Sequence, residues 1–309
     1  MGAIRHTITR AEHVLEPSHL VGRAPPPKCS LVLTAPYVSL VHAELRFRGD
    51  VWEVKDLGSR NGTYLDGRRI EPSVACEIAK GSILAFGKPE EQWQMIDHGP
   101  PPVMAVPLGG GAPVVLDGEL LALPSNDDPR ATIYRTIEGA WVIEPIDGAP
   151  TSLVHLQTFE AAGHMWRFLS PEVSPSTLAI GGTIGMGLEV RKLHLHFEVS
   201  RDEEHVHLRA SSGARDVDLG SRRHNYLLLT LARRRLADAA EGLPETSCGW
   251  IDTDDLAHDP TMSQVQLNVN VFRIRQQFAK VGVLDAAAIV ERREQQLRLG
   301  TSLVTTTTV

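Results

Sequence analysis

The pattern of apolar and polar residues changes twice along this 309-residue chain. Over residues 1–98, short apolar or alternating runs are separated by turn-forming residues about every eight to twelve positions. The clearest runs are Ser30–Thr34, Ala43–Phe47, Trp52–Asp56 and Ser82–Phe86. Short strands at this spacing are typical of a β-sandwich. Residues 1–98 are therefore predicted to form an all-β domain.

A second β-rich stretch follows a segment rich in proline and glycine. Residues 99–113 predict a linker, and residues 114–172 return to strand-like patterns. Residues 159–172 also resemble residues 77–90, with several identities at an offset of 82 positions. The stretch is either a degenerate repeat of the first domain or a chance recurrence of a strand–turn–strand pattern. A second linker is predicted at residues 173–191.

From residue 192 onward, the pattern combines strands with helices. Two alternating strands joined by a polar turn come first, and a helix with Ser221 as its cap is expected next. A short helix after Asp252 or Thr253, a long helix at Gln264–Lys280 and a hairpin at Ile289–Leu299 follow. We expect no regular structure in the threonine-rich tail, residues 305–309.

The long predicted helix carries apolar side chains on two sides. One stripe has the spacing of a face packed on a core, and consists of Leu267, Val271, Ile274 and Phe278. A second stripe on the other side consists of Val265, Val269 and Phe272. A face of this second kind can meet thymine methyl groups or a protein partner.

Charge and cysteine content narrow the classes of function. The formal net charge is −7, and residues 101–190, with 3 basic and 10 acidic residues, account for the whole excess. No segment is strongly basic, which argues against a high-affinity non-specific nucleic-acid binder. Three scattered cysteines and the lack of a long apolar run favour a cytoplasmic protein with no membrane contact.

Three predicted loops of the first domain carry polar residues in a distinctive order. Gly22-Arg23 comes first, then Ser39 and His42 in an S-x-x-H pattern, then Arg60-Asn61-Gly62-Thr63. The pair Asn61-Gly62 alone would also suit a two-residue hairpin turn. The order and spacing together resemble the forkhead-associated (FHA) domain, a phosphothreonine-binding β-sandwich, over about residues 15–97.

The resemblance implies a role for each of these residues. Arg23 would present its guanidinium fork to a phosphate, Ser39 a hydroxyl, and Asn61 a carboxamide that reads the peptide backbone. Further contacts or braces of the phosphopeptide site would be Arg60 and Thr63. The structural positions of the family fall on Gly22, His42 and Gly62.

The strand–helix–hairpin order of residues 192–304 resembles the winged-helix output domain of response regulators of the OmpR/PhoB type. In that family the third helix enters the major groove of DNA and the hairpin touches the backbone. The candidate DNA contacts are Asn268, Asn270, Arg273, Arg275, Arg292 and Arg293. These residues could instead form the solvated side of an amphipathic helix.

Other chemistry finds little support in the sequence. His194, His196, His205 and His207 could share one face of a hairpin, but no carboxylate or cysteine stands at ligand spacing. We therefore predict no metal site and no cofactor. No nucleophile–base constellation or phosphate-binding glycine loop is present, so we predict that the protein is not an enzyme.

The sequence thus predicts a multidomain protein: an N-terminal all-β FHA sandwich, a β-rich middle segment and a C-terminal α+β winged helix. The expected function is phosphothreonine-dependent signalling in a bacterial Ser/Thr kinase pathway, as a regulator of transcription. Its partners would be a phosphothreonine-containing protein and DNA, with a homodimer possible. The alternative is an adaptor whose winged helix docks a protein.

Overall fold

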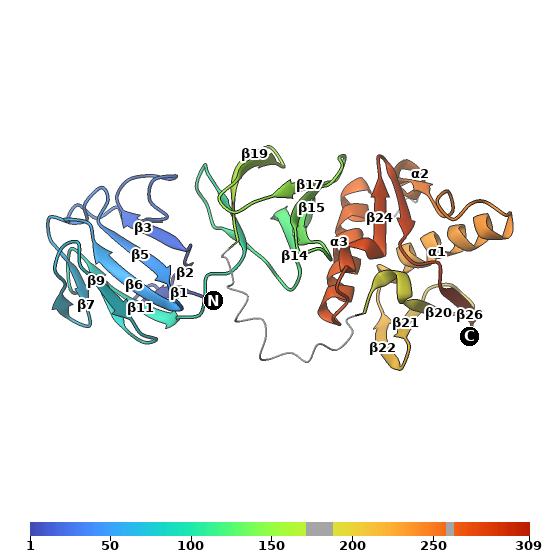
Figure 1. Cartoon of the computed structure of the whole chain (residues 1–309), viewed down its shortest axis with the longest axis horizontal. Helices are drawn as coiled ribbons and strands as arrows, with labels where there is room; N and C mark the ends of the chain where they lie inside the picture. The colour runs from blue at the N-terminus through green and yellow to red at the C-terminus, as the bar shows by residue number, and fades with distance from the viewer. Residues whose placement is uncertain (171–187, 258–262) are drawn as a thin grey trace. The chain divides into compact units, whose positions relative to one another are not determined.

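The computed structural model describes residues 1–170, 188–257 and 263–309 (Figure 1). The chain divides into two compact units, Met1–Val115 with Val154–Ser174 and Leu116–Leu153 with Pro175–Val309. It therefore passes from the first unit to the second after Val115 and returns after Leu153. The predicted linker at 173–191 lies mostly outside the described residues.

Residues 3–97 form a sandwich of two sheets, as the sequence predicts. The six-stranded sheet has the order β2-β1-β11-β10-β7-β8, with β1 (Ala3–His6), β2 (Glu12–Val14), β7 (Thr63–Leu65), β8 (Arg68–Arg69), β10 (Ile83–Phe86) and β11 (Gln92–Asp97). The five-stranded sheet has the order β4-β3-β5-β6-β9, with β3 (Ser18–Gly22), β4 (Leu31–Val32), β5 (Ala43–Arg48), β6 (Val51–Asp56) and β9 (Ala75–Ile78). Each of the four predicted runs overlaps one of these strands, with β5 and β6 each one residue longer than the run. The inward residues of both sheets, among them Leu45, Trp52 and Phe86, form one buried core.

The segment predicted as the first linker contains a buried strand. β12 (Met104–Pro107) and β13 (Val114–Val115) form a four-stranded sheet with β18 (Thr158–Ala161) and β19 (His164–Leu169), in the order β13-β12-β19-β18. Met104 and Ala105 are fully buried. Proline and glycine around this short apolar run suggested a linker, but burial of the run against β19 makes it part of the fold.

The resemblance between residues 77–90 and 159–172 does not extend to strand pairing. β9 and β10 belong to different sheets of the sandwich, whereas β18 and β19 pair with each other as a hairpin. Residues 159–170 therefore differ in strand pairing from the sandwich residues that they resemble in sequence.

Residues 114–172 are not one structural segment. Their central part forms a separate antiparallel sheet of β14 (Leu120–Ser125), β15 (Asp128–Arg135), β16 (Trp141–Pro145) and β17 (Thr151–Leu153). This sheet belongs to the second unit and packs on its longest helix, because α3 contacts both β14 and β15. We call residues 116–153 the inserted sheet.

The rest of the second unit has the predicted strand–helix–hairpin order. A sheet of order β22-β21-β20-β26 is followed by three helices and the three-stranded sheet β23-β25-β24. The strands are β20 (His194–Val199), β21 (Val206–Ser212), β22 (Arg215–Ser221), β23 (Ile251–Asp252), β24 (Val290–Arg293), β25 (Gln296–Leu299) and β26 (Val304–Thr308). The helices are α1 (Asn225–Ala240), α2 (Thr253–Ala257) and α3 (Gln264–Lys280), with short 3-10 turns at Val190–Lys192 and Ala286–Ile289.

Two local predictions for this unit are wrong. Ser221 is the last residue of β22, and α1 begins after His224 without a side-chain cap. The threonine-rich tail is not irregular: β26 pairs in parallel with β20, with Thr306 opposite Phe197. The β-branched side chains of threonine favour an extended strand, and β20 offers a free edge to it.

Candidate functional site

Three loops at one end of the sandwich bring the predicted phosphopeptide residues together. The Ser39 hydroxyl accepts a hydrogen bond of 3.0 Å from the Arg60 amide, which joins the β4–β5 loop to the β6–β7 loop. Asn61 joins the same two loops, since its Nδ2 donates to the Tyr37 carbonyl at 2.7 Å. Arg23, from the β3–β4 loop, donates through Nε to the Val38 carbonyl at 2.5 Å. The three loops therefore present one continuous polar surface.

His42 connects two of these loops by hydrogen bonds beneath the surface. Its Nδ1 accepts from the Ser39 amide at 3.0 Å, and its Nε2 lies 3.1 Å from the Gly62 carbonyl. These partners require the neutral tautomer with the proton on Nε2. Burial lowers the pKa of His42 in spite of its bond to Gly62, so the ring is neutral at pH 7. His42 is fully buried and thus positions Ser39 from inside the domain.

Asp56 is a member of the site that the sequence analysis missed. It is buried at the end of β6, where Oδ1 accepts from the amides of Gly58 and Ser59. Its Oδ2 accepts from the hydroxyls of Ser59 and Thr63, each at 2.6 Å. Burial alone would raise the pKa of Asp56, but these donors hold it below its usual value. An aspartate followed by Gly58-Ser59 is a turn signal that could have revealed it.

Thr63, one of the predicted peptide-binding residues, does not reach the surface. Its side chain is fully buried, and its hydroxyl is used by Asp56. It braces the β6–β7 loop from inside. The pair Asn61-Gly62 is also not a two-residue hairpin turn, because it connects β6 and β7, which belong to different sheets.

Both glycines of the motif are required by close approach or by backbone conformation. A Cβ on Gly22 would stand 2.4 Å from the Leu40 carbonyl oxygen. Gly62 has a φ of +86°, which L side chains rarely adopt, and a Cβ there would meet Arg69. Larger residues at either position would push the loops apart.

The resulting surface is suited to an anion. Arg23 and Arg60 are exposed, and neither forms an ion pair with any residue that the structure describes. Guanidinium groups beside a hydroxyl and a carboxamide are the donors that a phosphate monoester needs. Leu40, next to Ser39, is 61% exposed and adds an apolar contact at the rim.

The six candidate DNA contacts of the second unit differ in how far they are buried. Asn268 and Arg275 are buried, and the side chain of Arg292 is only 7% exposed, whereas Asn270 is half-buried and Arg273 is exposed. The sixth, Arg293, is exposed and lies over the Trp250 ring with its guanidinium carbon 4.3 Å from the centroid.

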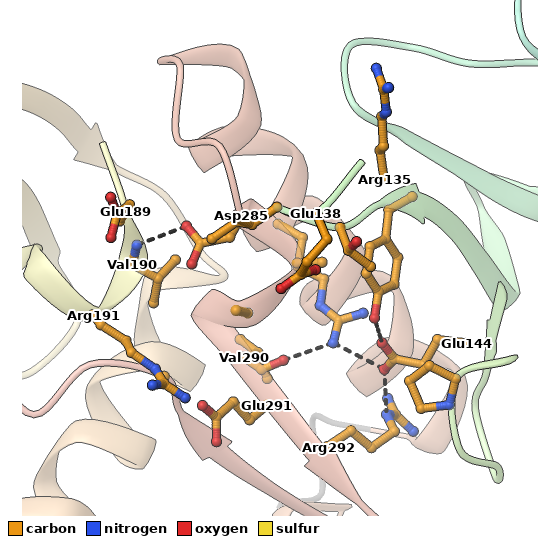
Figure 2. Close-up of a pocket in the computed structure, with 18 of the residues that line it drawn as sticks. Arg135, Glu138, Glu144, Glu189, Val190, Arg191, Asp285, Val290, Glu291 and Arg292 are labelled. Atoms are coloured by element: carbon orange, nitrogen blue, oxygen red, sulfur yellow. Dashed lines mark hydrogen bonds and ion pairs between the residues drawn. The ribbon is translucent and has the colours of Figure 1, made fainter. Parts of the chain in front are cut away.

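The buried arginines meet one buried glutamate (Figure 2). Arg275 donates to Glu144 at 3.0 Å and to the Val290 carbonyl at 2.7 Å. Arg292 lies 3.8 Å from Glu144. Burial alone would raise the pKa of Glu144, but the two guanidinium groups and the Tyr134 hydroxyl hold it below its usual value. In this arrangement the guanidinium groups of Arg275 and Arg292 already have partners within the chain.

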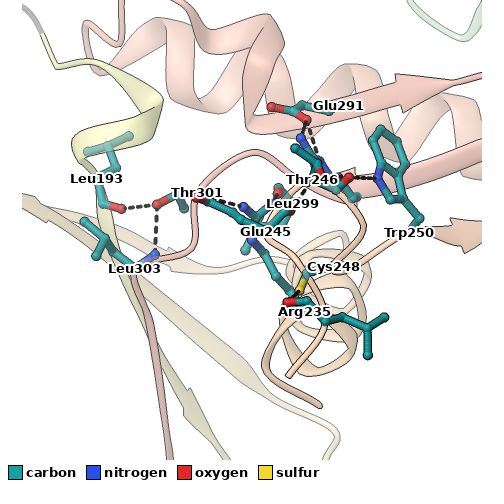
Figure 3. A network of polar contacts seen from close by, with 12 residues as sticks. Leu193, Arg235, Glu245, Thr246, Cys248, Trp250, Glu291, Leu299, Thr301 and Leu303 are labelled. Atoms are coloured by element: carbon teal, nitrogen blue, oxygen red, sulfur yellow. Dashed lines mark hydrogen bonds and ion pairs between the residues drawn. The ribbon is translucent and has the colours of Figure 1, made fainter. Parts of the chain in front are cut away.

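A second polar network fixes the hairpin to α1 (Figure 3). The buried Arg235 donates to the Leu299 carbonyl at 2.6 Å. Arg298 donates to Glu291 at 2.5 Å. The guanidinium groups of Arg298 and Arg293 both lie over the Trp250 ring. The hairpin is therefore tied to α1 through Arg235 and to Trp250 through two arginines.

The strand histidines have other partners. His196 bonds the Thr305 hydroxyl at 2.7 Å, and His207 lies 2.9 Å from Asp218. The described ranges contain no group of three or more potential metal ligands. No helix in those ranges is long and apolar enough to cross a membrane.

Comparison with known proteins identifies one part of the chain. Residues 19–87 match the family model of the FHA domain. The FHA domain-containing protein FhaB of Mycobacterium tuberculosis is 46% identical over 69 residues, which are 22% of this chain and 42% of that protein. FhaB of Mycolicibacterium smegmatis has the same identity and coverage. The match thus spans less than half the length of these relatives.

Solved structures match a similarly small share of this chain. A structure of Mycobacterium tuberculosis EmbR in complex with a low affinity phosphopeptide is 20% identical. It covers 32% of this chain and 25% of that chain, with a TM-score of 0.28.

Proposed function

We propose, from the premise that residues 19–87 are an FHA domain, that this chain binds a phosphothreonine peptide in Ser/Thr kinase signalling. The observation that carries the proposal is the meeting of Arg23, Ser39 and Asn61 from three separate loops. Their side chains offer a charged donor, a hydroxyl and a carboxamide on one surface. The role is that of a binding protein rather than an enzyme.

A phosphothreonine carries nearly two negative charges and three strong acceptor oxygens. Arg23 and Arg60 supply the charge that binds the phosphate, and Ser39 supplies a short neutral donor. Asn61 has donor and acceptor atoms that can pair with the peptide backbone. The fixed loops lower the entropic cost of binding, because His42 and Asp56 hold these groups before the peptide arrives.

Titration of a phosphothreonine peptide library into the full chain tests this proposal. Arg23→Ala and Ser39→Ala should each weaken binding by about ten- to a hundredfold, since a charge-assisted bond contributes about 1.5–3 kcal/mol. Arg46→Ala is the matched control, because Arg46 is an exposed arginine of β5 away from the three loops. Equal affinities for the two site variants and the parent would show that the site is elsewhere.

A second candidate function concerns the second unit, which we infer to be the winged-helix DNA-binding domain of a cytoplasmic transcription regulator that acts as a homodimer. The observation that favours it is the order of a four-stranded sheet, three helices and a hairpin paired with β23. Asn270 and Arg273 on α3 and Arg293 on the hairpin are not buried and have side chains suited to DNA.

Selection of binding sequences from random oligonucleotides, with and without phosphopeptide, tests DNA binding. Arg293→Ala should weaken all sequences alike and reduce the salt dependence, as loss of a phosphate contact does. Arg273→Ala should cost about 1–3 kcal/mol at one base position. If no motif is enriched and a protein partner binds instead, the adaptor alternative holds. Phe272 is no longer a candidate docking residue for that partner, since it is 2% exposed.

A further inference from the structure

The inserted sheet supplies partners to three side chains of α3, namely Arg275, Gln276 and Lys280. Glu144 accepts from Arg275 at 3.0 Å, and Asp117 accepts from Gln276 at 2.7 Å. Asp117 also lies 3.7 Å from the Lys280 ammonium group. The covered side of α3 thus faces carboxylates of the inserted sheet.

The adjacent hairpin shows the same arrangement. Arg292, on β24, donates to the Ile146 carbonyl of the inserted sheet at 2.6 Å. Its other terminal nitrogen donates to the Asn268 side chain at 3.2 Å, so this α3 residue is also occupied. Donors from a helix and a hairpin therefore converge on one region of the inserted sheet (Figure 2).

The charge of the inserted sheet matches this role. Its seven acidic residues are Asp117, Glu119, Asp127, Asp128, Glu138, Glu144 and Asp147, against two basic residues, Arg130 and Arg135. The remainder of the second unit that follows is balanced in charge, with 16 basic and 16 acidic residues over 191–309. Carboxylates of this acidic sheet therefore lie against Arg275 and Lys280 of α3 and Arg292 of the hairpin.

We propose that the covered side of α3, with Arg292 beside it, is a nucleic-acid-binding surface that the chain's own inserted sheet occupies. Glu144 and Asp117 take the positions that phosphate oxygens would take, so the sheet competes with nucleic acid. This inference rests on the proposed DNA-binding function. It explains why residues suited to DNA by type and position are buried in the folded chain.

The packing makes the covered form the resting one. Phe272 lies in one core cluster with Leu120 and Ala122 of the inserted sheet. A buried glutamate shared by two guanidinium groups is also costly to separate from them. Because the inserted sheet is part of the same chain, its effective concentration at α3 is high and it lowers the apparent affinity for a duplex.

The full chain with Glu144→Gln tests the proposal, with Glu138→Gln on the exposed part of the inserted sheet as the control. A neutral amide holds two arginines less well, so hydrogen exchange of amides in Asn268–Gln276 should rise by about tenfold or more. Affinity for a fluorescent random-sequence DNA duplex should rise by about tenfold for the same reason. Adding Arg275→Ala should remove the gain in affinity and keep the gain in exchange. The control should change neither quantity.

The outcomes separate the inference from the function on which it rests. Faster exchange in α3 with an unchanged, measurable duplex affinity would overturn the competition and leave DNA binding intact. Faster exchange with no duplex binding by any variant would overturn both. If Glu144→Gln unfolds the unit, Asp117→Asn, which changes an exposed contact, gives the same readings. No change of exchange or affinity in that variant would then count against the proposal.

Discussion

At the scale of single residues, the sequence motif located the surface groups of the phosphopeptide site but not their supports. Arg23, Ser39 and Asn61 follow from the order of the motif, because the family carries them at fixed places between strands. Asp56 does not, since an aspartate at the end of a strand is common, and its four donors become visible only in three dimensions. Thr63 was expected as a contact or a brace, and its buried hydroxyl, bonded to Asp56, makes it a brace.

Asp56→Ala should lower the affinity for phosphopeptide although Asp56 cannot touch it. The change leaves the Ser59 amide and the Thr63 hydroxyl without an acceptor, which costs about 1–3 kcal/mol of loop stability. Calorimetric titration and thermal unfolding of the variant measure both effects. Asp50→Asn, at an exposed turn whose positive φ asparagine also tolerates, is the control. An unchanged affinity in Asp56→Ala would mean that the β6–β7 loop keeps its shape without the carboxylate.

The buried His19 should make the first unit less stable in acid. Burial, together with the neighbouring His13, lowers the pKa of His19 to about 3. The unfolded chain, with a histidine pKa of about 6.5, binds the proton first. The free energy of unfolding is therefore unaffected by His19 above pH 6.5. Below that, it falls by about 1.4 kcal/mol per pH unit as the pH drops toward 3.

Denaturant unfolding of the parent and of His19→Asn between pH 6.5 and 4.5 measures this slope. Asparagine keeps an acceptor for the Glu16 amide but does not titrate. Burial raises the pKa of Glu16, which acts in the opposite direction and is present in both proteins. The variant should show the shallower slope, and identical slopes would assign the acid sensitivity to other groups.

At the scale of elements, helical periodicity predicted α3 and its core stripe, and the structure confirms both. Leu267, Ile274 and Phe278 are fully buried. Periodicity could not predict which part of the chain packs on the second apolar stripe of this helix. Val269 and Phe272 are buried as well, because residues more than a hundred positions earlier fold onto them. Such a pairing leaves no local pattern in the sequence.

Deletion of residues 304–309 should destabilise the second unit. β26 pairs with β20 over five positions, and those backbone bonds would be lost. At about 0.5–1.5 kcal/mol per bond, less the entropy regained by the tail, we expect a loss of about 1–3 kcal/mol. Thermal unfolding followed by circular dichroism measures it. Replacing Thr305–Thr308 by serine keeps the backbone bonds and should cost less, and an unchanged midpoint after deletion would contradict the role of β26.

At the scale of the whole molecule, composition suggested three successive domains, whereas the chain forms two compact units that share the middle segment. Residues 114–172 look uniform in sequence because both of their sheets are antiparallel and use similar strands. The chain nevertheless divides within them, after Val115 and again after Leu153. Contacts over long distances in sequence decide this division, and they are not visible in a window of neighbouring residues.

Residues 1–100 alone should bind a phosphothreonine peptide within about threefold of the full chain, well under the tenfold that corresponds to 1.4 kcal/mol. All strands of the sandwich lie within this range, and so does the Gly99 carbonyl that accepts a bond from Trp52. Parallel titrations of the fragment and the full chain give the comparison. A fragment that is folded by circular dichroism but binds much more weakly would show that residues beyond 100, in either unit, take part in peptide binding.

The division of the middle segment also sets an order for folding during synthesis. The sandwich can close once Asp97 has left the ribosome, because β1 pairs with β11. β12 must wait for β19, and the inserted sheet, made in the interval, must wait for α3. Its acidic strands remain without their arginine partners until Arg275 and Arg292 are made. The surplus of negative charge, unlike an apolar face, keeps such a waiting segment soluble.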